Sequence, residues 1–181
     1  MRQAKPNWRL KKTISRPVDY RPIEQDDVKY AWISYKKGAL ADLGPKFADT
    51  SMNADEFKIA FQVEVTTAYH GAWTLLAQTP RGFMPVGFVL GFWSHPEPRY
   101  SVFMNVGAMV WLPIASKRNK IETAIYFFNS IRNDFPMVEY AREKDKRFFE
   151  VVARHGVMRR VGTSHNIYPG EPAAVYETRR P

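Results

Sequence analysis

Apolar and polar positions along the chain predict a mixed fold in which helices come early and strands follow. Residues 18–23 form a short extended run. Acidic residues at 24, 26 and 27 then precede apolar residues at helical spacing, which predicts a helix that ends near Gly38. A second helix is expected between residues 53 and 71. Apolar alternation at positions 61, 63 and 65 also fits a strand, but the capping sequence at 53–56 favours the helix.

From residue 72 onward the pattern changes to strands that alternate with two helices. It predicts helices at 120–133 and 145–155, and strands at 72–78, 83–93, 101–112, 136–140, 157–162 and 173–178. The first two of these strands form a hairpin. The last two form another, and residues 164–172 are its loop. The order is β-α-α-β-β-β-α-β-α-β-β. Because a helix joins strands 101–112 and 136–140, we expect these two strands to lie side by side and parallel.

Length and composition narrow the class of protein. The chain has 181 residues, of which 45% are hydrophobic and 14% aromatic, so it can bury a real core in one domain. It has no cysteine, which excludes disulfides, thiolate metal sites and cysteine nucleophiles. The four histidines lack metal-ligand spacing, so no metal site is expected. No apolar stretch is long enough for a membrane span and no signal sequence is visible, so we expect a soluble cytoplasmic domain.

The positive charge is concentrated at the N-terminus. The net charge is +9, and residues 1–16 contribute six basic side chains and no acid. We therefore divide the chain into a basic arm, residues 1–16, and a domain, residues 17–181. The arm is expected to bind a polyanion such as nucleic acid, with Trp8 stacking on a base. The alternative is a solvated terminus that aids solubility.

The order of elements resembles the GNAT superfamily of acyl-CoA-dependent N-acyltransferases. The likeness covers residues 18–178 and includes two segments, MVWLPIASKRNKIETAIYFF and FFEVVARHGVMRRVGT. It implies an α+β fold in which helices flank a central, twisted, mostly antiparallel sheet. It also implies transfer of an acetyl group from acetyl-CoA, or of another acyl group from its CoA ester, to an unidentified amine. The chain further resembles divergent GNAT-type proteins of tailed bacteriophages, which implies a possible association with the virion.

The resemblance implies that the cofactor pyrophosphate binds where strand 101–112 leads into the next helix. Family members have spaced glycines in this loop, whereas residues 113–122 contain none. The basic side chains of Lys117, Arg118 and Lys120 would have to offset the phosphate charge instead. The expected cofactor-binding residues are Val110, Trp111, Leu112, Ser116, Lys117, Arg118, Asn119 and Lys120. The alternative is a helix start without ligand, because Asn119 and Glu122 have capping-box spacing and would occupy the amides that the phosphate needs.

Acyl transfer to an amine needs a base for the amine, donors for the oxyanion and an acid for the departing thiolate. Many family members have a tyrosine four residues before the glycine that ends the last helix. Here that position is Val152, before Gly156. Tyr140 is the substitute candidate for the acid, although a half-buried structural tyrosine is the alternative. A base is expected among Glu64, His70 and His165, or in an ordered water, and of these His165 lies in the last hairpin loop, which borders the acceptor site in this superfamily.

Two hypotheses of different classes remain. The first is an acyl-CoA-dependent N-acyltransferase. The second is a catalytically inactive protein of GNAT fold that serves as a structural or nucleic-acid-associated component, for example of a phage particle. The basic arm and the glycine-free loop support the second. Acetyl-CoA binding distinguishes the two.

Overall fold

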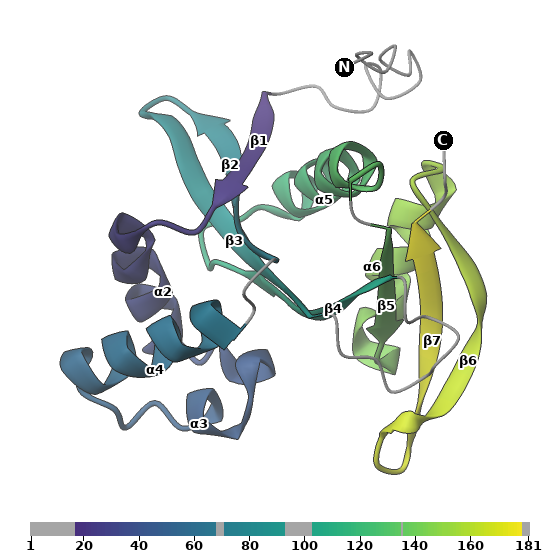
Figure 1. Ribbon diagram of the computed structural model, residues 1–181. Coiled ribbons are helices and arrows are strands. Elements are labelled where there is room, and N and C mark those ends of the chain that lie inside the picture. Colours follow the sequence, from purple (N-terminus) through teal and green to yellow (C-terminus); the bar gives the residue numbers. More distant parts are fainter. Residues whose placement is uncertain (1–16, 68–70, 93–102, 135, 179–181) are drawn as a thin grey trace.

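The computed structural model describes residues 17–67, 71–92, 103–134 and 136–178. Helices and strands follow the predicted order, with two 3₁₀ turns and one short helix added (Figure 1). The elements are β1 (Val18–Pro22), a 3₁₀ turn (Gln25–Asp27), α2 (Val28–Tyr35), a second 3₁₀ turn (Ala41–Leu43), α3 (Pro45–Ala48), α4 (Ala54–Thr67), β2 (Ala72–Thr79), β3 (Gly82–Phe92), β4 (Met104–Trp111), α5 (Lys117–Ile131), β5 (Met137–Ala141), α6 (Glu143–Arg154), β6 (Met158–Tyr168) and β7 (Glu171–Thr178). Within these described ranges no helix is both long enough and apolar enough to span a membrane. The basic arm predicted at residues 1–16 lies outside them.

All seven strands belong to one sheet, in the order β1-β2-β3-β4-β5-β7-β6. Every neighbouring pair is antiparallel except β4 and β5, which are parallel. The prediction of an α+β fold with a mostly antiparallel sheet is therefore confirmed. So is the parallel pairing of the two strands that α5 connects.

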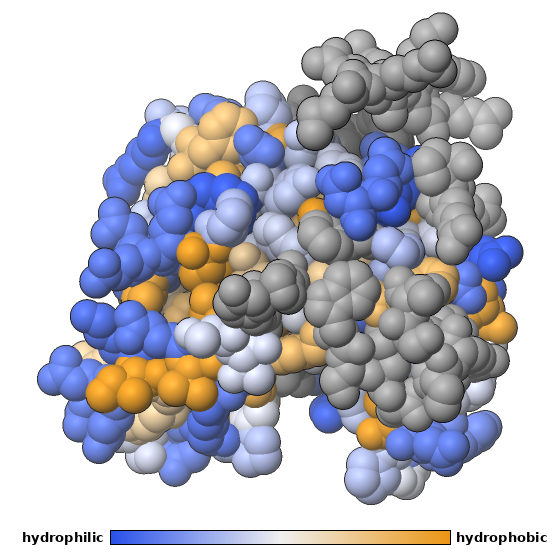
Figure 2. Space-filling model, viewed as in Figure 1, coloured by the Kyte–Doolittle hydropathy of each residue, from blue (hydrophilic) through white to orange (hydrophobic). Residues whose placement is uncertain are grey.

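Helices cover both faces of the sheet, and the alternation of side chains along β3 and β4 shows how. Val89 and Val106 face α5 and α6 and belong to the largest core cluster. Phe88 and Val110 point to the opposite face and pack with residues of α2, α3 and α4. Figure 1 shows α2–α4 gathered beside β3 and β4, away from the β6–β7 hairpin. In the space-filling view the outline is notched between these helices and the end of that hairpin (Figure 2).

A buried ion pair fixes the start of the first helix to the sheet. Asp27 is fully buried and accepts hydrogen bonds from both terminal nitrogens of Arg21, at 2.7 and 2.9 Å. It also accepts from the Thr74 hydroxyl at 2.7 Å and from the backbone N–H of Glu24 at 2.9 Å. Burial alone would raise the pKa of this carboxyl, but the hydrogen bonds from Arg21, Glu24 and Thr74 outweigh it and lower the pKa. The four bonds connect β1, β2 and the segment leading into α2.

The main differences from the prediction lie in two loops and at the start of one helix. The predicted loop at 39–50 contains a 3₁₀ turn and α3. The predicted loop at 164–172 is mostly strand, because Gly170 adopts a φ of 74° and closes a tight turn after Pro169. Helix α5 begins at Lys117, three residues earlier than predicted.

The ambiguity at residues 61–65 is resolved as helix. The side chain of Asn53 accepts hydrogen bonds from the backbone N–H groups of Asp55 and Glu56, both at 3.0 Å. Glu56 in turn accepts from the Asn53 N–H at 2.8 Å, which completes a capping box at the start of α4. The capping sequence therefore identified the helix correctly.

Candidate functional site

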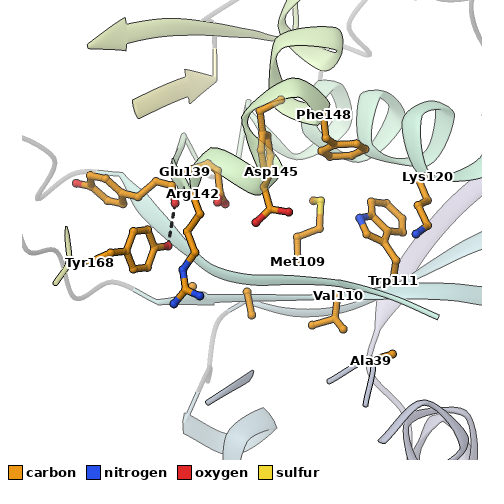
Figure 3. Close-up of a pocket in the computed structure, with 14 residues that line it drawn as sticks. Ala39, Met109, Val110, Trp111, Lys120, Glu139, Arg142, Asp145, Phe148 and Tyr168 are labelled. Carbon is orange, nitrogen blue, oxygen red and sulfur yellow. Dashed lines mark hydrogen bonds between the residues drawn. The ribbon is translucent and has the colours of Figure 1, made fainter. Parts of the chain in front are cut away.

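A cleft opens where β4 and β5 separate. These strands pair at only two positions, Met104 with Met137 and Asn105 with Val138. Beyond them the strands diverge, and a cavity of about 490 Å³ lies between them. Residues 107–111 of β4, the end of β5 and the start of α6 line the cavity (Figure 3).

The edge of β4 presents backbone groups to this cleft. The N–H of Leu112 donates to the carbonyl of Val86 at 2.9 Å, so Leu112 faces β3. Backbone groups alternate sides along an antiparallel strand, which directs those of Met109 and Trp111 away from β3 and toward the cleft. The register of β3 and β4 shifts by one residue beside Gly107, which is the extra residue of a β-bulge. Two backbone donors and a bulge therefore lie along the open edge.

One end of the cleft lies at the start of α5. Ser116 is the N-cap, and its hydroxyl accepts a hydrogen bond from the Asn119 N–H at 3.1 Å. Asn119 is thus the third residue of the helix and does not cap it. Glu122 does not fold back to an N-terminal amide; it accepts a hydrogen bond from Nε of Arg118 at 2.8 Å. The predicted capping box of Asn119 and Glu122 is wrong, because Ser116 offers the same cap three residues earlier.

With Ser116 as the cap, backbone N–H groups at the start of α5 are available to bind an anion. The backbone N–H groups of Lys117 and Arg118 lie in the first turn of the helix, where no helical carbonyl stands four residues earlier to accept a hydrogen bond from them. The positive end of the helix dipole lies at the same place. Arg118 is held by Glu122, whereas Lys117 and Lys120 form no ion pair with any described residue. Lys120 is half-buried and lines the cleft.

The other predicted site residues lie at different distances from the cleft. Val110, Trp111 and Tyr140 line it together with Lys120. Leu112 is buried against α2–α4, while Ser116, Lys117, Arg118 and Asn119 form the helix start without lining the cavity.

The candidate bases are not brought together at the cleft. His165 is exposed on β6 and does not line it, because the expected hairpin loop is a strand. Glu64 forms an ion pair with Lys46 at 2.6 Å. His70 lies outside the described residues. Val152 is a buried core residue.

Two carboxyl groups at the cleft were not singled out from the sequence. Glu139 of β5 is 8% exposed, and Asp145 lies in the first turn of α6 (Figure 3). Burial, and then the negative charge of Asp145, raise the pKa of the Glu139 carboxyl well above its usual value. The only charged residue in the apolar run of residues 137–141 is Glu139, and that contrast is the sequence signal that could have identified it.

Tyr168 and Arg142 line the cleft on the side opposite Lys120, called here the far mouth (Figure 3). The hydroxyl of Tyr168 donates to the backbone carbonyl of Tyr140 at 2.9 Å. The guanidinium of Arg142 lies 4.4 Å from the centre of the Tyr168 ring, a cation–π contact. Burial and the nearby Glu139 raise the pKa of Tyr168, and Arg142 partly offsets this. Tyr140 is itself buried and packs on the opposite face of β5 from Glu139.

This chain is similar to known proteins in its three-dimensional structure but not in its sequence. No protein-family model and no curated protein sequence matches this chain. Solved structures do match, including a putative GNAT-family acetyltransferase from Bordetella pertussis, with a TM-score of 0.63, 10% identity, and 91% of this chain and 96% of that chain covered. The chain has the GNAT fold.

Two further structures support this assignment. A GNAT-family acetyltransferase from Bacillus anthracis has a TM-score of 0.61 and 12% identity, with 91% of this chain and 96% of that chain covered. A putative acetyltransferase from Salmonella typhimurium, solved with its cofactor acetyl-CoA, has a TM-score of 0.58 and 10% identity, with 90% and 94% covered. The GNAT fold thus extends over nearly the whole chain, and at these identities the likeness concerns the fold.

The reassigned cap of α5 can be tested by stability. Ser116→Ala removes the acceptor for the Asn119 N–H and should lower the free energy of unfolding by about 1 kcal/mol. Asn119→Ala is the matched control, and it should change that free energy by less than about 0.5 kcal/mol. Urea unfolding of the three proteins gives both values. A larger loss for Asn119→Ala than for Ser116→Ala would restore the cap at residue 119.

Proposed function

We propose that this protein is an acyl-CoA-dependent N-acyltransferase that uses acetyl-CoA, or another acyl-CoA, as co-substrate and an amine as acceptor. The observation that carries the proposal is the cleft between β4 and β5. It combines an open strand edge along β4 with a cationic helix start at one end. A long, linear ligand with an anionic head matches that combination.

The residues at the helix start suit the phosphates of such a ligand. Amides at residues 117 and 118, together with the helix dipole, attract an anion at this position. Lys117 and Lys120 add charge without requiring the close backbone approach that glycine allows. The glycine-free loop is therefore compatible with phosphate binding through charge.

The walls of the cleft suit the rest of the ligand. The backbone groups of Met109 and Trp111 can pair with the amides of a pantetheine arm, as a neighbouring strand would. The Trp111 ring packs edge-on against Phe148 of α6 at 5.7 Å between centroids, which gives the arm an apolar wall. The amine would attack the thioester carbonyl beside the β4 bulge, and a backbone N–H of β4 would stabilise the oxyanion.

The two catalytic side chains predicted from the sequence keep their proposed roles, Tyr140 as the acid and His165 as the base. Tyr140, the candidate acid, lines the cleft, and its ring packs on the opposite face of β5 from Glu139. His165, the candidate base, is exposed on β6 and does not line the cleft. The acceptor would be deprotonated by His165 or by an ordered water.

A second candidate function is that of a GNAT-fold protein without catalysis, serving a structural or nucleic-acid-associated role such as a component of a phage particle. Two observations favour it. Val152 occupies the position where the resembling family carries its tyrosine, and it is buried in the core. No glycine is present in the loop before α5. Under this alternative acetyl-CoA does not bind.

Removing the cations at the helix start tests the first proposal. Lys117→Ala combined with Lys120→Ala should weaken acetyl-CoA binding several-fold to tens of fold, about 1–3 kcal/mol, because two charge-assisted contacts are lost. Isothermal titration calorimetry measures the affinity. The control is Arg147→Ala with Arg154→Ala, which removes equal charge from exposed positions of α6 and should leave the affinity within about twofold.

The two candidate functions predict different results for the parent protein. Saturable heat with millimolar acetyl-CoA supports the enzyme, whereas its absence leaves the non-catalytic candidate. If both double variants weaken binding equally, net charge is responsible and the phosphate site at α5 is rejected.

We propose separately that residues 1–16 bind nucleic acid. The segment carries six basic side chains without an acid, and each phosphate that it neutralises would release counterions. Deletion of residues 1–16 should therefore remove most of the affinity for DNA or RNA at low salt, and the affinity of the full chain should fall steeply as salt rises. Fluorescence anisotropy with a labelled oligonucleotide measures both. Equal retention of the oligonucleotide by the full and the shortened chain would overturn the proposal.

A further inference from the structure

Glu139 lies at the closed end of the cleft. Val138 is the last residue of β5 that pairs with β4, and Glu139 is the next residue along the strand. Its neighbours at alternate positions, Met137 and Ala141, belong to the core cluster beneath α5 and α6, so the Glu139 side chain points to that face. The carboxyl lines the cavity (Figure 3).

The Glu139 carboxyl is buried with one oxygen unused. Oε2 has no hydrogen-bond partner among the residues that the structure describes. A buried carboxylate in that condition carries a large desolvation cost, whereas a neutral carboxylic acid carries a much smaller one and has a proton to donate. Burial and the charge of Asp145 both favour the neutral form. A neutral, buried Glu139 can therefore donate a hydrogen bond to an acceptor on a ligand in the cleft.

Among the described residues, five charged or titratable groups line the cavity beside Glu139. Lys120 of α5, Tyr140 of β5, Arg142 and Asp145 of α6, and Tyr168 of β6 line the same cavity. On the other side Glu139 pairs with Tyr176 of β7, whose hydroxyl contacts the backbone carbonyl of Lys146 at 3.4 Å. Arg142 stacks on Tyr168 and forms no ion pair with another described residue. No cation in the described part of the chain therefore neutralises Glu139.

We propose that Glu139 is the proton donor to the sulfur of the acyl-CoA that binds in this cleft. The inference rests on the proposed function. With the phosphates at the start of α5 and the arm along the edge of β4, the thioester lies toward the point where β4 and β5 come together. That is the position of Glu139.

Acyl transfer with Glu139 as the donor conserves atoms and electrons. The amine nitrogen forms a bond to the thioester carbonyl carbon, and the carbon–sulfur bond breaks with both electrons going to sulfur. Sulfur takes the proton of the Glu139 carboxylic acid, which gives CoA with a free thiol and leaves a carboxylate. The amine loses one proton to solvent, and Glu139 regains one from solvent before the next cycle. The products are the amide and CoA, and no oxidant or reductant is required.

The test is the pH dependence of acetyl-CoA binding to the parent protein and to Glu139→Gln. Glutamine has nearly the same shape and keeps an N–H donor at every pH. In the parent the donor exists only below the raised pKa of Glu139 and is lost as the pH rises through it, so over a titration from acid to alkaline pH the affinity should fall about tenfold relative to the variant. Calorimetry in two buffers of different ionisation enthalpy should also detect proton uptake by the parent in this range, and none attributable to position 139 in the variant.

Two controls test whether Glu139 is the titrating group and whether it acts on the arm of the ligand and not on its phosphates. Asp145→Asn removes the negative charge that favours protonated Glu139, so the fall in affinity should move to lower pH. Adenosine 3′,5′-diphosphate carries the 3′-phosphate and the first phosphate of the pyrophosphate of CoA, without the arm or the sulfur. Its affinity should be the same for the parent and Glu139→Gln at every pH. Circular dichroism verifies that the variants are folded.

The outcomes separate this inference from the function on which it rests. If acetyl-CoA fails to bind the parent, the enzyme proposal fails and the role of Glu139 falls with it. If acetyl-CoA binds but the ratio of the two affinities changes less than twofold across the pH range, the role of Glu139 is overturned while the enzyme proposal stands. An equal effect on adenosine 3′,5′-diphosphate would also overturn it, because the carboxyl would then act on the phosphates.

Discussion

The brevity of the parallel pairing between β4 and β5 is the constraint on which the rest of the site depends. Helix α5 connects the two strands and brings their first residues together, as a crossover between parallel strands must. Pairing ends after two positions, and the strands then diverge. Had it continued to Trp111, β5 would occupy the edge of β4 and no cleft would exist. The unused backbone groups of β4 are stable there because the cleft admits water or a ligand.

The cleft has opposite electrostatic character at its two ends. At the start of α5 the helix dipole, Lys117 and Lys120 favour an anion. At the closed end the buried Glu139 carboxyl lies within electrostatic reach of Asp145, whose negative charge favours its neutral form. A ligand with charged phosphates at one end and an uncharged, reactive thioester at the other matches this gradient. A uniformly charged ligand would meet an unfavourable environment at one of the two ends.

Much of the fold could be predicted from the sequence because its elements have strong local signals. The apolar spacing of α5 and the capping residues of α4 are examples, and the parallel strand pair followed from the intervening helix. The start of α5 was misplaced because Ser116 and Asn119 are both good caps, and local spacing cannot choose between them. The extent of β6 was missed because Pro169 and Gly170 make a turn tight enough to extend both strands.

The chemistry of the site was harder to predict. Lys120, Trp111 and Tyr140 were expected at the cleft from the family resemblance and do line it. Glu139 and Asp145 were not expected, because their proximity depends on how far β5 diverges from β4 and on how α6 packs over the gap. Their effect on each other is a tertiary property that no local pattern encodes.

Hydrogen exchange at the edge of β4 tests the central claim most directly, since it reports on the backbone that the cleft leaves open. NMR can measure exchange of the Met109 and Trp111 amides with and without saturating acetyl-CoA. Acetyl-CoA should slow exchange at both amides more than at Val110, whose backbone groups face β3. Unchanged exchange at Met109 and Trp111 in a sample where acetyl-CoA is bound would contradict it, because the ligand would then lie elsewhere.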